Sequence, residues 1–123
     1  MCFVIGKRNK IRRAKRNICC WKIGNYFKSS FRSSIRNHSY FKNSWTPLLF
    51  LRIVKERDYA IGGMCGLSNV INVGYHSYSN REVAISLCPK TKHVVKFIIP
   101  KGSKYYYNRY FHEFVSNQII WKD

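Results

Sequence analysis

The side chains with the greatest chemical potential in this 123-residue chain are cationic. Lysines and arginines number 23 against 5 aspartates and glutamates, which gives a formal net charge of +18. Residues 1–55 contain no acid at all. Self-repulsion on this scale destabilises a compact fold unless anions lie against it. The composition therefore predicts a polyanionic partner, either nucleic acid or an acidic protein surface.

Nucleic acid is the first candidate because cationic side chains release condensed counterions when they contact phosphates. Aromatic rings among the cations would stack on bases, and both residues 26–45 and residues 101–107 have this mixture. The tyrosines of the second segment have an alternative role, as packing on a half-buried sheet face. The cations predicted to contact nucleic acid are Lys7, Arg8, Lys10, Arg12, Arg13, Lys15, Arg16, Lys28, Arg32, Arg36, Lys101 and Lys104.

Acid–base catalysis has little support in the sequence. Of the five acids, Glu113 alone has a promising setting, beside His112 and before an apolar segment. A pair of carboxylates for hydrolysis is not indicated. Three glycines, Gly62, Gly63 and Gly66, lie close together, but the phosphate-binding pattern G-x-x-x-x-G-K-[ST] is absent. We expect a protein that is not an enzyme.

The cysteines predict no metal site. The chain has five, an odd number, without a C-x-x-C or H-x-x-x-H pair of the kind that signals zinc. Only Cys19 and Cys20 are close in sequence, and adjacent cysteines rarely bridge each other. The sequence therefore predicts reduced, mostly buried thiols, with no metal and no cofactor.

These patterns predict one α+β domain. We expect a basic N-terminal arm over residues 1–17, followed by a domain over residues 18–123 with a curved mixed or antiparallel sheet and one or two short helices. Because no apolar run approaches the length of a membrane span and the first residues are unlike a secretory signal, we expect an intracellular or virion protein and no membrane partner.

The expected elements follow from periodicity and breakers. The spacing of Phe27, Phe31 and Ile35 predicts a helix, and residues 79–88 predict a second, short helix capped by Ser79 or Asn80 and closed by Pro89. Strands are expected at 18–23, where the strand is buried, at 46–54, at 70–78 with a break at Gly74, and at 114–121. A loop is expected at 55–69. Residues 93–107 are expected to form a hairpin that turns at Pro100–Gly102 and whose first strand is buried on both faces.

Three motifs, "GYHSY", "VVKFIIPKGSKYYYN" and "EFVSNQII", resemble those of a family of small uncharacterised proteins of tailed phages, large DNA viruses and some bacteria. The likeness covers roughly residues 16–122. The family has no established activity, so this resemblance implies a virus-associated protein without assigning a reaction.

A more distant resemblance is to the ADP-ribosyltransferase-like fold. It places Lys22 at the position of a first-strand Arg or His, His76, Ser77 and Tyr78 at the second motif, and Gln118 or Glu113 at the position of the catalytic Glu. A neutral amide at the last position stabilises a developing cation poorly. The resemblance thus implies a fold whose activity is lost.

Two functions follow. The first is a small basic protein without enzymatic activity that binds nucleic acid or an acidic partner, as part of a virion or beside other virion proteins. The alternative is a degenerate transferase-like module that binds NAD or a related nucleotide.

Overall fold

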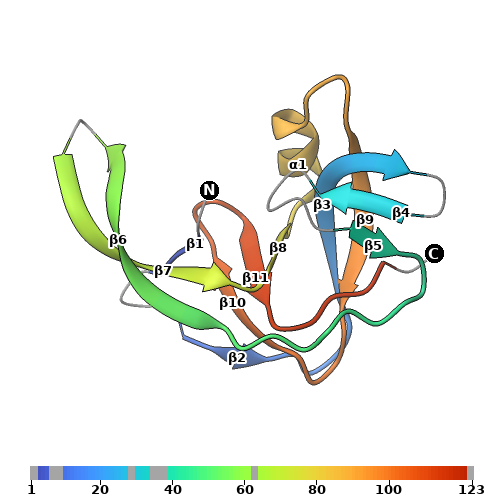
Figure 1. Cartoon of the computed structure of the whole chain (residues 1–123), viewed down its shortest axis with the longest axis horizontal. Coiled ribbons are helices and arrows are strands. Elements are labelled where there is room, and N and C mark those ends of the chain that lie inside the picture. Colours follow the sequence, from blue (N-terminus) through green and yellow to red (C-terminus); the bar gives the residue numbers. More distant parts are fainter. Residues whose placement is uncertain (1–2, 6–9, 28–29, 34–38, 62–63, 122–123) are drawn as a thin grey trace.

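Antiparallel β-structure dominates the computed structural model of this chain, which describes residues 3–5, 10–27, 30–33, 39–61 and 64–121 (Figure 1). The described residues form one small domain with two sheets and one short helix. The smaller sheet has the order β1 (Phe3–Ile5), β7 (Met64–Val73) and β6 (Arg52–Ile61). No helix in this described part of the chain is both long and apolar enough to cross a membrane.

The larger sheet has eight strands. The long strand β3 (Ile18–Phe27) lies at its centre and pairs with β9 (His93–Ile99) over residues 18–24. The remaining order runs β2 (Arg12–Arg13), β10 (Lys104–Asn108), β11 (Glu113–Ser116), β8 (Tyr75–Tyr78), β3, β4 (Ser30–Ser33) and β5 (Ser39–Phe41). The expected sheet-dominated α+β class is thus confirmed in its coarse form, as a mostly antiparallel sheet with a short helix.

The helix is where the sequence predicts it. Helix α1 (Arg81–Leu87) begins after Asn80, whose side-chain oxygen accepts hydrogen bonds from the amides of Glu82 and Val83. Such a cap satisfies amides that have no partner within the helix. Ala84 is fully buried where α1 packs against β3, β8 and β9.

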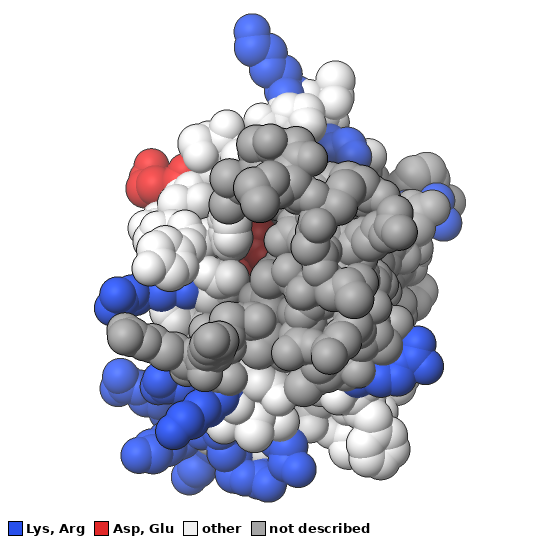
Figure 2. Space-filling view, turned by 90° about the vertical axis from the view of Figure 1, so that its left-hand side faces the viewer, with Lys and Arg blue, Asp and Glu red and all other residues white. Residues whose placement is uncertain are grey.

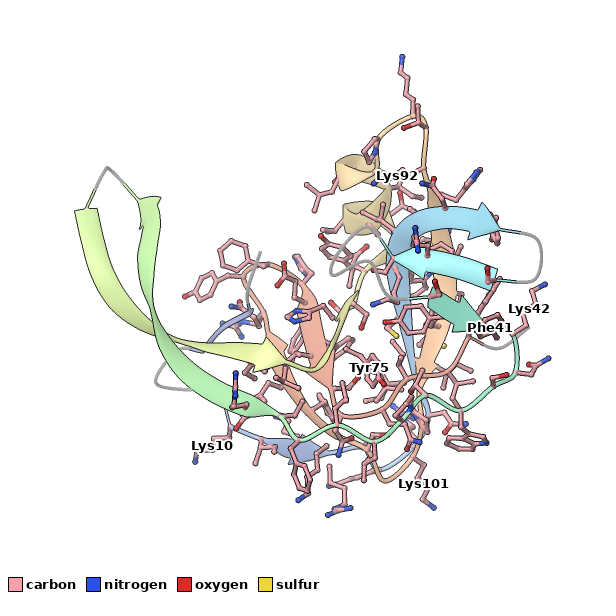
Figure 3. All side chains as sticks on the ribbon, viewed as in Figure 1. Lys10, Phe41, Lys42, Tyr75, Lys92 and Lys101 are labelled. Carbon is pink, nitrogen blue, oxygen red and sulfur yellow. The ribbon has the colours of Figure 1, made fainter. Side chains whose placement is uncertain are left out.

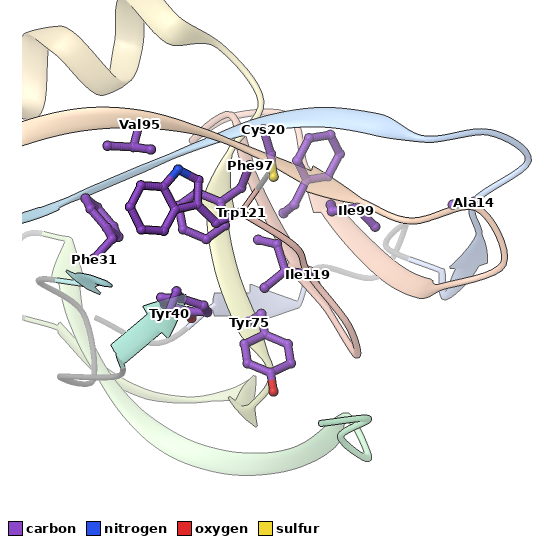
Figure 4. Close-up of a cluster of buried hydrophobic side chains, with 11 residues drawn as sticks. Ala14, Cys20, Phe31, Tyr40, Tyr75, Val95, Phe97, Ile99, Ile119 and Trp121 are labelled. Carbon is purple, nitrogen blue, oxygen red and sulfur yellow. The ribbon is translucent and has the colours of Figure 1, made fainter. Parts of the chain in front are cut away.

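The main core lies on one face of the eight-stranded sheet (Figure 4). Side chains alternate between the two faces of a strand, and the even-numbered residues of β3 point into this core. Opposite them on β9 are Val95, Phe97 and Ile99, all buried. Phe97 stacks on Trp121, with ring centroids 6.1 Å apart. Val94 and Ile98 on the other face of β9 are half-buried while Lys96 is exposed, so the predicted burial of β9 on both faces is wrong.

The helix predicted from Phe27, Phe31 and Ile35 is wrong. The described part of this segment forms β4, which pairs antiparallel with the end of β3, and residues 28–29 and 34–38 lie outside the described residues. Phe31 lies opposite Tyr26 and is fully buried. Cross-strand contacts with the core thus outweigh the weak helical preference of a serine- and aromatic-rich segment.

The loop predicted at 55–69 is also wrong. This segment belongs to a long hairpin of β6 and β7 that extends away from the larger sheet (Figure 1). An antiparallel ladder satisfies backbone groups whatever the side chains are, so charged and glycine-containing segments can still pair. Gly62 and Gly63 lie outside the described residues. The chain over 46–51 has no regular structure, so the strand predicted at 46–54 begins only at Arg52.

The hairpin predicted at 93–107 does not form. Strand β9 pairs with β3, whereas β10 pairs with β11 and β2. The turn between them is as expected: Gly102 has φ +91°, and the amide of Ser103 donates to the carbonyl of Pro100 at 3.1 Å. The predicted last strand is shorter than expected, since β11 ends at Ser116 and only Ile120 and Trp121 make further isolated bridges. The break at Gly74 is confirmed between β7 and β8.

Candidate nucleic-acid interface

Two basic segments that are far apart in the sequence meet at one end of the sheet. The amide of Ala14 donates to the carbonyl of Ser103, and the amide of Gly102 donates to the carbonyl of Ala14, both at 2.8 Å. The guanidinium of Arg13 donates to the carbonyl of Gly102 at 3.0 Å. Strand β2 then pairs with β10, with Arg13 opposite Lys104. Residues 10–17 are therefore held against the turn at 100–103.

A groove of about 680 Å³ opens along this junction. Cationic side chains form much of its wall and apolar side chains the remainder. The cations are Lys10, Arg12, Arg13, Lys15 and Arg16, and the apolar and aromatic residues are Ile11, Ile18, Tyr105 and Phe114. We call this feature the basic groove. Its volume falls within the range of about 300–1,000 Å³ that is typical of ligand pockets.

The charge around the basic groove is concentrated and exposed. Its five cations, together with Lys101 of the adjacent turn and Lys104 at the start of β10, are all exposed. Figure 2 shows a dense group of Lys and Arg at the lower end of the molecule, the end where β2 and the turn after β9 lie in Figure 1. Lys10 and Lys101 both project from this end, whereas Lys92 lies toward the opposite end of the molecule, beside α1 (Figure 3).

The two acids whose side chains the structure describes lie elsewhere. Glu82 is on α1 and its carboxylate is 3.9 Å from the guanidinium of Arg81. Glu113 lies at the start of β11, opposite Tyr78. Neither carboxylate lines the basic groove. Like charges in a recess with few nearby counter-charges reinforce one another, which attracts a polyanion.

Tyrosine and phenylalanine side chains form the aromatic part of the groove wall. Tyr105 is half-buried, and its ring meets that of Phe114 edge to face, with centroids 5.7 Å apart. Tyr107, two residues along the same strand, also contacts Phe114, at 4.9 Å. Tyr106 is buried on the opposite face with Val115 and Ile71. The predicted alternation of the three tyrosines is confirmed, and all of them contribute to packing.

Other predicted contacts lie away from the basic groove or outside the described residues. Arg32 is exposed on β4, at a different part of the sheet. Lys7, Arg8, Lys28 and Arg36 lie outside the described residues. Aromatic rings in residues 26–45 are expected to stack on bases, and they differ in exposure. Phe31 and Tyr40 are buried in the core, while Phe41 and Trp45 are 56% and 67% exposed.

The residues implied by the transferase-like resemblance fall on neighbouring strands but on two faces. Strand β8 lies between β3 and β11, with Tyr78 opposite both Trp21 and Glu113. Alternation puts His76, Tyr78 and Glu113 on the face that α1 covers, and Lys22 and Ser77 on the face of the main core. Gln118 lies beyond β11, where its side-chain amide donates to the carbonyl of Thr46 at 3.3 Å. The resemblance implies one shared site, and the register divides its residues between two faces.

Lys22 has an enclosed environment. It is only 3% exposed, its ammonium donates a hydrogen bond to the carbonyl of His76, and it lies 5.1 Å from the centroid of the Tyr40 ring. Burial lowers the pKa of Lys22 to about 8. Burial likewise raises the pKa of the neighbouring Cys20 thiol to about 12, which Ser77 and Lys22 oppose only weakly. Both shifts have the same cause, since burial disfavours the charged form of each group.

Titratable groups on the other face also respond to burial. Burial raises the pKa of Glu113, and burial followed by the charge of Glu113 raises the pKa of Tyr78. Of the cysteines whose side chains the structure describes, Cys20 is buried, Cys88 is half-buried and Cys19 is exposed, and these three are free thiols. The expectation is that the thiols are mostly buried; Cys20 fits it, whereas Cys19 does not. Within the described ranges, no three His, Cys, Asp or Glu side chains gather as metal ligands would.

Sequence reasoning found the cations of the basic groove and missed part of its apolar wall. Ile11, Ile18 and Phe114 line it, and each stands next to a residue whose role was predicted. Their local signal is that of ordinary core residues, so only the pairing of β2 with β10 identifies them. The chain matches no protein-family model, and comparison with curated proteins and with solved structures gives no match.

Proposed function

We propose that this protein binds nucleic acid through the basic groove and catalyses no reaction. The observation that carries the proposal is the convergence of residues 10–16 with the turn at 101–104, which creates a recess walled by exposed cations. An acid-free stretch of sequence could have distributed its charge over the surface. Here five of its cations, between residues 10 and 16, lie together in the wall of this recess.

The chemistry of the groove favours phosphates. Three of its cations are arginines, whose planar guanidinium groups suit bidentate contacts with phosphate oxygens. Every cation set against a phosphate releases counterions, so affinity should fall steeply with salt. Together with the resemblance to proteins of phages and large DNA viruses, this supports a place in a virion or in the infected host cytoplasm, next to viral nucleic acid.

Two matched triple variants test the proposal. One removes groove charges with Lys10→Gln, Lys15→Gln and Arg16→Gln, and the other removes the same types of charge elsewhere with Lys90→Gln, Lys96→Gln and Arg109→Gln. All six side chains are exposed, and both variants lower the net charge from +18 to +15, by three charges. Their affinity for a labelled oligonucleotide would be measured by fluorescence anisotropy at several salt concentrations.

We expect the groove variant to bind more weakly and to reduce the slope of log affinity against log salt by about 2, at about 0.7 for each phosphate contact on a single strand. The control variant should keep the slope of the wild-type protein. Equal losses in both variants would mean that net charge alone drives binding, without a site. Tighter binding of polyglutamate than of the oligonucleotide would identify an acidic protein as the partner and overturn the proposal.

A further inference from the structure

We infer that the basic groove takes single-stranded nucleic acid, with an unpaired base stacked on Tyr105. This inference rests on the proposed function, and it adds the class of nucleic acid that is bound and the residue that contacts its base. It follows from one juxtaposition in the groove wall, that of a tyrosine ring and an arginine on adjacent strands.

Tyr105 and Arg12 are directly opposite each other in the pairing of β10 with β2. Residues paired in this way point to the same face, with Cβ atoms about 4.5–5.5 Å apart. Both side chains line the basic groove. A flat ring next to a guanidinium matches the two parts of a nucleotide, since the base stacks on the ring while its phosphate meets the cation.

The ring of Tyr105 is held in place by Phe114, and part of it remains open for contact with a base. Its ring rests edge to face on Phe114, which is buried in the core. A ring that is already fixed by the protein loses little freedom when a base stacks on it. Because Tyr105 is half-buried and lines the groove, part of its surface stays open to a ligand.

The size and chemistry of the groove favour a single strand over a duplex. In a duplex the bases are stacked within the helix, so their faces cannot reach a ring set in a protein recess. The bases of a single strand can unstack and enter such a recess. A volume of about 680 Å³ is that of a small-molecule pocket, which suits a splayed nucleotide and leaves a duplex to contact the rim alone.

The experiment compares two strands that differ only in their bases. A labelled oligothymidylate of about 12 nucleotides, within the site sizes of single-strand-binding domains, is measured against an abasic strand with the same number of phosphates. The same oligothymidylate hybridised to its complement supplies the duplex. We expect the wild-type protein to bind the oligothymidylate about 5- to 150-fold more tightly than the abasic strand.

Three variants assign the difference to one ring. Tyr105→Leu should remove the preference for bases and keep the affinity for the abasic strand, while Tyr105→Phe should keep both. Tyr107→Leu is the matched control, because Tyr107 lies on the same face of β10 and contacts Phe114 without lining the groove. It should bind both strands as the wild-type protein does.

The outcomes separate this inference from the proposed function. Equal, salt-dependent binding of abasic strand and oligothymidylate by the wild-type protein would overturn base stacking and leave phosphate binding intact. Duplex binding that is as tight as single-strand binding would overturn it too. Failure to bind any of the three probes, or binding insensitive to salt, would overturn both. The wild-type comparison needs no substitution, so a variant that fails to fold does not affect it.

Discussion

The guanidinium of Arg13 donates a hydrogen bond to the carbonyl of Gly102 at 3.0 Å, and 89 positions of sequence separate the two residues. This contact joins strand β2, which lies within the basic N-terminal segment, to the turn between β9 and β10. It also uses one cation of the basic groove to fix the groove's own wall. The same contact therefore serves both the binding surface and the fold, and the side chain of Asn17 holds the turn as well.

Replacing Asn17 should loosen the turn at 100–103. The side-chain oxygen of Asn17 accepts a hydrogen bond from the amide of Lys101 at 2.9 Å. Asn17→Ala removes this acceptor, which should cost about 1 kcal/mol of stability and accelerate amide exchange at Lys101 about fivefold. Hydrogen exchange followed by NMR checks this. Asn17→Asp keeps an acceptor and should retain protection, and unchanged exchange in the alanine variant would contradict the assignment.

Lys22 should make stability depend on pH. Its pKa is about 8 in the fold against 10.5 when unfolded, so between these values the unfolded state binds more protons. Stability contributed by this group therefore rises as pH increases from about 8 to 10.5, by about 3 kcal/mol in total. Below pH 8 the contribution is constant and least favourable, because the buried amine is charged.

The measurement is the free energy of unfolding in urea for the wild-type protein and for Lys22→Met, whose side chain has similar length and no charge. Their difference removes most of the contribution of Cys20, whose raised pKa weakens the fold above about pH 9 in both proteins. A difference that stays flat from pH 7 to 10.5 would show that Lys22 is not buried as described.

Glycine at position 24 should be indispensable. A Cβ there would collide with the carbonyl oxygen of Arg32 and approach Cζ of Phe31 to 2.8 Å. Backbone on β4 cannot move without disturbing the core, so Gly24→Ala should destabilise by about 2–4 kcal/mol. Gly102→Ala is the comparison: no heavy atom lies within 4 Å of its Cβ, and only the strain of φ +91° remains, about 1–2 kcal/mol. Thermal unfolding should rank Gly24→Ala as the more harmful, and the reverse order would refute the close approach of β3 and β4.

The adjacent thiols Cys19 and Cys20 should react very differently. Cys19 is exposed, whereas Cys20 is fully buried with its pKa raised to about 12. Since the thiolate is the reactive form, iodoacetamide should modify Cys19 in the folded protein and Cys20 only after unfolding. Fragmentation mass spectrometry distinguishes the two positions. Modification of Cys20 at the rate of Cys19 under native conditions would contradict the orientation of β3.

Part of the fold was predictable because its causes are local. Asn80 caps α1 and Gly74 divides β7 from β8, as cap chemistry and backbone freedom require. The apolar run after residue 17 became the central strand β3 for the same reason. The failures at 27–35 and 55–69 have the opposite cause: Phe31 satisfies helical spacing and strand pairing alike, and only a partner strand decides between them.

The sequence by itself determined that this protein is strongly cationic, that its acids are absent from the first 55 residues, and that a sheet forms together with a short helix capped near residue 80. These are properties of composition and of neighbouring residues. Only the tertiary structure decided that β9 and β10 take different partners, that Lys22 is enclosed in the core, and that residues 10–16 meet residues 101–104 around a groove. Such pairings depend on which strand edges and faces become buried together, and the spacing of residues along the chain does not predict this.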